Sequence, residues 1–170
     1  MSWKNLSAFQ LFAEYVEVGT NISFAEIVKH LSVRETIIQE YGQPGLAYQQ
    51  KFCEIWEIKK EFPWFPKDKV FINKDFRKKI TIAFKALEEK GLHKEIKTFD
   101  GCYVDRLSRG LKVKSLHAWA MAIDLNAAAN PLGGPIKFSV AFLQTMKDCG
   151  IYCGAYWKRK DGMHFALFNG

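Results

Sequence analysis

The pattern of hydrophobic and polar positions predicts three helices in the first third of the chain. A short helix is expected over residues 6–15. Ser23 and Glu26 have the spacing of a capping box, so a second helix should begin at Phe24 and stop before Gly42. A third helix is predicted over Leu46–Glu61. The residues expected on the inner faces are Phe9, Phe12 and Val16, then Phe24, Ile27, Val28 and Leu31, then Tyr48, Phe52, Ile55 and Trp56.

An aromatic segment with two prolines, residues 62–66, follows the third helix and forces extended backbone. It is the best internal boundary, and it divides a helical N-terminal region, residues 1–65, from a core of residues 66–170 on which that region packs. Aromatic residues beside prolines more often pack a connector onto a core than form an exposed binding patch. We therefore expect this segment to be packed.

The second part of the chain combines two more helix patterns with short strand patterns. Asn73 or Asp75 can cap a helix that Gly91 ends, and a further helix is stopped at Gly150. The expected inward residues are Phe76, Ile80, Ala83, Phe84 and Leu87 in the first, and Phe138, Ala141, Phe142, Thr145 and Cys149 in the second. Short strands are predicted over 96–99, 103–104, 121–125, 152–157 and 163–168, with a turn at residues 100–101. Helices that precede a small antiparallel sheet give an α+β class.

The composition indicates a folded domain and an anionic partner. A chain of 170 residues with 48% hydrophobic residues and 14 Phe suits one folded domain and excludes a disordered tail. The net charge of +7 favours anionic partners, either nucleic acid or the anionic polymers of a bacterial wall. The basic residues are scattered beside acidic ones without a long basic run, so nucleic acid is not the expected partner.

We expect neither a secretory signal nor a membrane-spanning segment in this sequence. The start of the chain lacks an apolar signal region, which predicts synthesis in the cytoplasm. No apolar run is long enough to span a bilayer, so no membrane insertion is expected. The sequence gives no basis for an oligomeric state.

Candidate chemistry lies in residues 115–126, where His117 and Asp124 stand among small and apolar residues. A buried carboxylate must be paired or bound to a cation, and a second isolated histidine, His164, lies downstream. Two His and one Asp can form an open zinc site. Positions seven apart lie roughly 23 Å apart on a strand and about 10 Å on a helix, so the chain must bend between His117 and Asp124. Spacing alone leaves a structural His and a capped or salt-bridged Asp as the more frequent alternative. His30 and His93 are expected to be surface residues.

The two halves of this pattern together resemble peptidase family M15, the zinc D-alanyl-D-alanine carboxypeptidases and phage L-alanyl-D-glutamate endopeptidases. The resemblance rests on Ser115-x-His117, then Asp124, and the later Asp161-x-Met163-His164-Phe165, and it covers about 67–168. It implies a Hedgehog/DD-peptidase-like α+β fold whose small antiparallel sheet carries a zinc site.

The resemblance also implies roles for individual residues. His117, Asp124 and His164 match the metal ligands, and Asp161 matches the acidic residue that activates water. Arg106 matches the arginine that holds the substrate carbonyl. Arg109 is a second candidate for binding the substrate, and Ser115 is expected at the substrate site as a hydrogen-bonding neighbour and not as a nucleophile. Trp157 is a candidate wall of the substrate groove, with simple packing as the more frequent alternative. Three positions depart from the family pattern: Ala120 replaces a usual Gly, Gly162 a frequent Pro, and Ala166 a frequent Glu.

The expected function is a zinc-dependent peptidoglycan peptidase that cuts the bond between L-alanine and D-glutamate. The absence of a signal peptide suggests a phage-type endolysin that is made in the host bacterial cytoplasm and acts at the cell wall after release. A D-alanyl-D-alanine carboxypeptidase of the same fold is one alternative. A non-catalytic module that binds cell wall or nucleic acid is the other.

Overall fold

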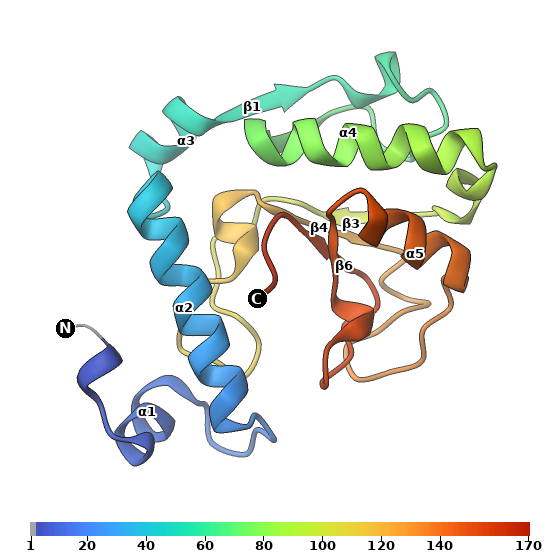
Figure 1. Ribbon diagram of the computed structural model, residues 1–170. Coiled ribbons are helices and arrows are strands. Elements are labelled where there is room, and N and C mark those ends of the chain that lie inside the picture. Colours follow the sequence, from blue (N-terminus) through green and yellow to red (C-terminus); the bar gives the residue numbers. More distant parts are fainter. Residues whose placement is uncertain (1–2) are drawn as a thin grey trace.

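The computed structural model describes residues 3–170 (Figure 1). In that part of the chain five α-helices combine with two antiparallel sheets, which confirms the α+β prediction. None of the described helices has the length and apolar character needed to cross a membrane.

The N-terminal helices begin at capping boxes. Helix α1, Ala8–Tyr15, is capped by Ser7, and helix α2, Phe24–Tyr41, by Ser23 with Glu26, as predicted for the second helix. A short 3-10 turn, η1 (Trp3–Asn5), precedes them. The inner face of α1 was predicted wrongly, because Leu11 is buried while Phe9 is 81% exposed. Leu11 joins a small separate core with Ile22, Ile27, Leu31 and Leu111.

The prediction of one helix over Leu46–Glu61 is wrong beyond its first half. Helix α3, Leu46–Phe52, ends in strand β1, Cys53–Trp56, and the 3-10 turn η2, Ile58–Lys60, follows. Strand β1 pairs antiparallel with β2, Val70–Asn73. Successive side chains of a strand point to opposite faces of the sheet. Trp56 is therefore buried, while Ile55, expected inside, is 66% exposed. A tertiary partner strand thus overrides the helical spacing of the apolar residues.

Helix α4, Lys74–Glu89, and the aromatic connector form the main core beside β1 and β2. Asn73 caps α4, and its five predicted inward residues are all buried. Phe62 and Phe65 are buried, and both rings pack on Phe84 at centroid distances of 5.6 and 5.5 Å. The connector is therefore packed, as predicted. Gly91 ends the helical segment in the left-handed conformation and leads into η3, Leu92–Glu95.

The second sheet has the strand order β3-β4-β6-β5. Its strands are β3 (Phe99–Gly101), β4 (Ala122–Leu125), β5 (Tyr152–Cys153) and β6 (His164–Ala166), and the 3-10 turn η4 (Leu116–Trp119) precedes β4. The turn predicted at residues 100–101 is instead a bulge within β3, and 103–104 is not a strand. The strand predicted over 152–157 ends at Cys153, and the 3-10 turn η5, Gly154–Tyr156, replaces its second half.

Helix α5, Val140–Asp148, is capped by Ser139 and contacts α4, β5 and η3. Its buried face consists of Phe142, Leu143, Thr145 and Met146. Ala141, expected inside, is exposed, because the buried stripe is centred one position further along. The main core cluster takes side chains from Ile37 to Ala166, on both sides of residue 65. The division at residue 65 stays a prediction.

Candidate metal centre

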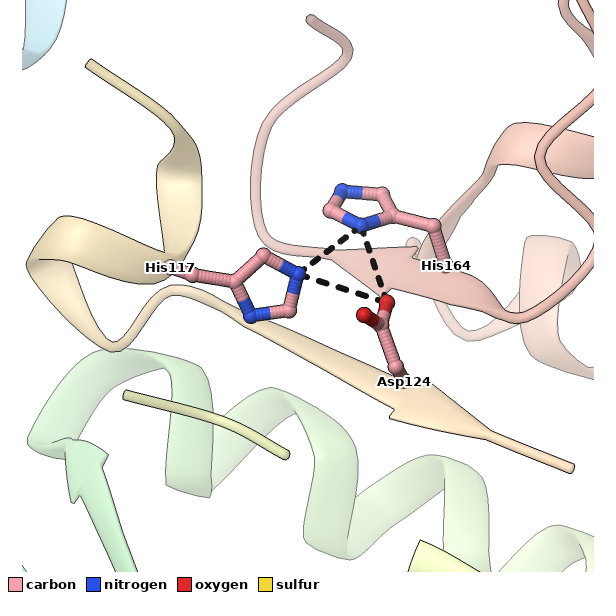
Figure 2. Close-up of side chains that lie close together, drawn as sticks. All are labelled: His117, Asp124 and His164. Atoms are coloured by element: carbon pink, nitrogen blue, oxygen red, sulfur yellow. Dashed lines mark hydrogen bonds and ion pairs between the residues drawn. The ribbon is translucent and has the colours of Figure 1, made fainter. Parts of the chain in front are cut away.

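Three side chains from three separate elements converge at the centre of the second sheet (Figure 2). His117 comes from η4, Asp124 from β4 and His164 from β6, and all three are buried. The His117 Nε2 atom lies 3.2 Å from His164 Nδ1, and Asp124 Oδ1 lies 3.3 Å from each of these nitrogens. We call these three residues the metal cluster.

The chain brings the metal cluster together by pairing two strands and by one sharp bend. Asp124 and His164 are register partners on β4 and β6, so their side chains are neighbours. His117 approaches because Ala120, between η4 and β4, adopts the left-handed conformation with φ 51° and ψ 32°. Ser115 caps the turn by accepting a hydrogen bond from the His117 backbone N–H at 3.4 Å. This bend explains how His117 and Asp124, which are seven residues apart in the sequence, reach the same site.

The donor geometry fits zinc. A tetrahedral site with zinc bonds of about 2.0–2.1 Å holds its ligand atoms roughly 3.3–3.4 Å apart. The three donors of the metal cluster lie 3.2–3.3 Å from one another. The second ring nitrogen of His117 lies 2.8 Å from the Cys102 carbonyl oxygen, to which it can donate while Nε2 offers its lone pair to the cluster. Two imidazoles and one carboxylate leave a fourth position open for water or substrate.

The charges of the cluster support the same assignment. Burial alone would raise the pKa of Asp124, but hydrogen bonds and charge from His117 and His164 hold that pKa well below its usual range. Burial lowers the pKa of His164, which favours the neutral ring. An ionised Asp124 carboxylate and a neutral His164 ring are the protonation states in which these two groups can bind a metal.

A cavity of about 630 Å³ adjoins the metal cluster and is lined by His164. This volume lies within the range of ligand sites. The other residues predicted for the site, Asp161, Arg106, Arg109, Ser115 and Trp157, also line it. The structure thus brings every predicted site residue either into the metal cluster or to the cavity beside it. Their chemical roles remain predictions.

Asp161 is a half-buried carboxylate three residues before His164. Its backbone carbonyl accepts the His164 N–H at 3.1 Å, and its Oδ1 is buried without a hydrogen-bond partner. Burial raises the pKa of Asp161, and the charge of Asp124 raises it further against the opposing effect of His164. A carboxylate that is poorly solvated and close to the metal cluster is suited to accept a proton.

The remaining predicted residues differ in their surroundings. Arg106 is partly buried, and burial together with Arg109 lowers its pKa, while Asp124 and Asp161 act in the opposite direction. Ser115 is 4% exposed and caps η4, so it positions His117. The Trp157 ring lies 5.2 Å from the His164 ring, and its indole N–H donates to Asn169 at 3.0 Å.

Residues of α2 that the sequence did not single out also line the cavity. His30, expected at the surface, is half-buried, and Arg34 is buried at 5% exposure. The prediction for His30 is wrong because α2 packs across the cavity instead of facing solvent there. The available signal was the spacing of Glu26, His30 and Arg34, which are four residues apart and share one face of the helix. His93 is half-buried as well, with its ring 5.1 Å from Trp64.

Comparison with known proteins gives one finding. A family model described as D-alanyl-D-alanine carboxypeptidase, within peptidase family M15, matches residues 109–167. The matched segment contains the metal cluster and Asp161. No curated protein and no solved structure gives a significant match. The match supports a peptidase family M15 assignment for residues 109–167, and with it a metallopeptidase that acts on peptidoglycan.

Proposed function

We propose that the protein is a zinc-dependent peptidoglycan peptidase that hydrolyses the L-alanyl-D-glutamate bond of the stem peptide. The observation that carries this proposal is the donor triangle of His117, Asp124 and His164, with edges of 3.2–3.3 Å, beside a cavity that also holds Asp161. The substrate is the bacterial wall. The protein would act as a phage-type endolysin, made in the host cytoplasm and reaching the wall after release.

Different residues of the chain have different roles in the proposed hydrolysis. When bound, zinc supplies Lewis-acid polarisation of the scissile carbonyl and lowers the pKa of water. Asp161 accepts a proton from the attacking water and passes it to the leaving amine. Arg106 stabilises the negative charge that develops on the carbonyl oxygen, and Arg109 assists in binding the peptide. Ser115 holds the turn that presents His117, and Trp157 packs against the substrate.

A D-alanyl-D-alanine carboxypeptidase is the second candidate function. The description of the matching family model favours it. The same residues would perform the same steps on a different bond, so the products distinguish the two activities. Free D-alanine identifies the carboxypeptidase, whereas new termini at L-alanine and D-glutamate identify the endopeptidase.

The test is digestion of purified peptidoglycan of several chemotypes by the wild type and by His164→Ala and Asp161→Asn, followed by mass analysis of the fragments. His93→Ala is the matched control, since it removes a half-buried histidine that lies outside the cavity. The wild type and His93→Ala should release peptides, chelation should stop release, and added zinc should restore it. Equal behaviour of the wild type and His164→Ala on every wall would end the catalytic proposal and favour a module that only binds.

A further inference from the structure

The cavity beside the metal cluster carries a strong excess of positive charge. The lining contains seven cationic side chains against two carboxylates, Glu26 and Asp161. The cationic residues are Lys29, Arg34, Arg106, Arg109, Lys147, Lys158 and Arg159. Low-dielectric walls around charges of one sign concentrate the field, so the cavity favours an anionic occupant.

Unpaired polar atoms are concentrated in the same place. Among residues 3–170, five buried side-chain nitrogen or oxygen atoms have no hydrogen-bond partner, and four of them belong to residues that line this cavity. These four are His30 Nδ1, Arg34 Nη1, Asp161 Oδ1 and His164 Nε2. Buried polar groups are normally paired, so this concentration favours a polar occupant beside these residues. Asp161 and His164 belong to the proposed chemistry, whereas His30 and Arg34 lie on α2 and have no role in it.

Arg34 is the most deeply buried cation of the lining. Its guanidinium donates to the Lys114 carbonyl at 2.9 Å and to the Ser108 hydroxyl at 3.2 Å, and both acceptors are neutral. No carboxylate lies within 4.0 Å of it in the part of the chain that the structure describes. Burial lowers the pKa of Arg34 to about 10, so the group is still charged at neutral pH. Its Nη1 atom, which has no hydrogen-bond partner, lies against the backbone of Gly170. A buried charge without a paired side-chain carboxylate is costly unless an anion binds to it.

His30 connects Arg34 to the metal cluster. It lies one helical turn before Arg34, its ring is 6.3 Å from the Trp157 ring, and Trp157 in turn is 5.2 Å from the His164 ring. Burial, together with the charges of Arg34 and Lys29, lowers the pKa of His30 to about 4, so the imidazole is neutral. A neutral imidazole with its proton on Nδ1 can donate one hydrogen bond to an acceptor that reaches it.

We propose that Arg34 and His30 form an anion subsite that binds a carboxylate of the substrate peptide while the scissile bond lies at the metal cluster. This inference rests on the proposed function and specifies its substrate. A D-glutamate that is joined to the next residue through one carboxyl group keeps the other as a free carboxylate, unless it is amidated. A hydrogen bond from a guanidinium to a carboxylate is charge-assisted, and this extra strength is lost when the carboxylate becomes an amide, whose carbonyl oxygen accepts a weaker hydrogen bond. The subsite therefore selects unamidated stem peptides.

The test compares two synthetic stem peptides that differ only in whether the D-glutamate carries a free carboxylate or an amide. Their dissociation constants are measured by calorimetry with zinc-loaded Asp161→Asn, in which hydrolysis is suppressed. We expect the carboxylate peptide to bind at least roughly tenfold more tightly. Addition of Arg34→Gln should abolish the preference, whereas Lys158→Gln, which removes an exposed cation of the same cavity, should retain it. Equal binding of the two peptides, or a preference that survives in Arg34→Gln, would overturn the proposal.

Two further measurements keep the outcome interpretable. If circular dichroism shows that Arg34→Gln is unfolded, His30→Leu replaces it and should reduce the preference several-fold, and an unchanged preference there contradicts the subsite. Cleavage of both peptides by the wild type is measured in parallel. Selective binding through Arg34 without cleavage refutes the proposed function and leaves the anion subsite standing. Cleavage without any preference refutes the subsite and leaves the function standing.

Discussion

The bend at Ala120 is the structural feature on which the metal cluster most directly depends. Ala120 has φ 51°, its N–H donates to the His117 carbonyl, and its own carbonyl accepts the Asn73 N–H at 3.0 Å. The side chain is fully buried. We predict that Ala120→Val will disrupt both the fold and the metal site, whereas Ala120→Gly will be nearly neutral.

The magnitudes follow from opposing contributions. The left-handed conformation costs an L-residue about 1–2 kcal/mol, and glycine avoids this cost. Glycine loses roughly 0.5–1 kcal/mol through its extra freedom in the unfolded chain, and removal of a buried methyl loses about 0.8 kcal/mol. Ala120→Gly should therefore change the free energy of unfolding by less than about 1 kcal/mol. A β-branched residue keeps the strain and overpacks the site, so Ala120→Val should cost at least about 2 kcal/mol.

The assays are urea unfolding of the metal-free protein and zinc affinity by competition with a chromogenic chelator. Ala118→Val is the matched control, because Ala118 is equally buried in the same turn but has negative φ. Ala120→Val should be less stable than this control by about 1 kcal/mol or more and should bind zinc at least roughly tenfold more weakly. If Ala120→Val matches the control in both assays, the left-handed bend does not set the positions of His117 and Asp124, and the reasoning is refuted.

Three further predictions concern the surroundings of the cluster. Tyr48→Phe removes a 2.6 Å hydrogen bond to the Trp119 carbonyl and should lower the free energy of unfolding by about 1–2 kcal/mol in urea. Arg106→Gln should lower kcat by about 10²-fold with zinc affinity unchanged, and a change confined to KM would contradict its proposed role. Because burial raises the pKa of Asp161 and the proposed base must be ionised, a pH–rate profile should show kcat falling on acidification at a higher pH than an exposed aspartate would give. An acid limb that persists unchanged in Asp161→Asn would contradict this assignment.

Local signals in the sequence predicted the elements that local interactions determine. The capping box at Ser23 and Glu26 and the cap at Asn73 fix where α2 and α4 begin, and both are visible in the sequence. Residues 53–56 could not be predicted in this way. Their apolar spacing suits a helix, but they form β1 because β2, some seventeen residues later, provides backbone partners. Long-range pairing of this kind leaves no mark on the spacing of a short segment.

The candidate site also combines residues that the sequence predicted with residues that only long-range packing brings together. The three donor residues and Asp161 were predicted from the resemblance of two sequence motifs, in that order, to those of peptidase family M15. The spacing of His117 and Asp124 also predicted that the chain must bend, and the bend lies at Ala120, the position already noted for its departure from glycine. The contribution of α2 was missed. His30 and Arg34 precede His164 by more than a hundred residues, and only the packing of α2 against the cavity brings them near.

The family match covers the metal cluster but not helix α2, which forms another wall of the cavity. The matched residues, 109–167, contain the metal cluster and the proposed base, which are the main parts of the proposed chemistry. The α2 wall of the cavity lies outside them, and it supplies a buried cation with no carboxylate partner among the described residues. The free energy that selects a substrate comes from groups that contact the parts of the peptide away from the scissile bond. If the proposed anion subsite on α2 decides which peptide is bound, the residues proposed to cut the bond can be shared across the family. Substrate choice should therefore be tested at Arg34 and not at the metal cluster.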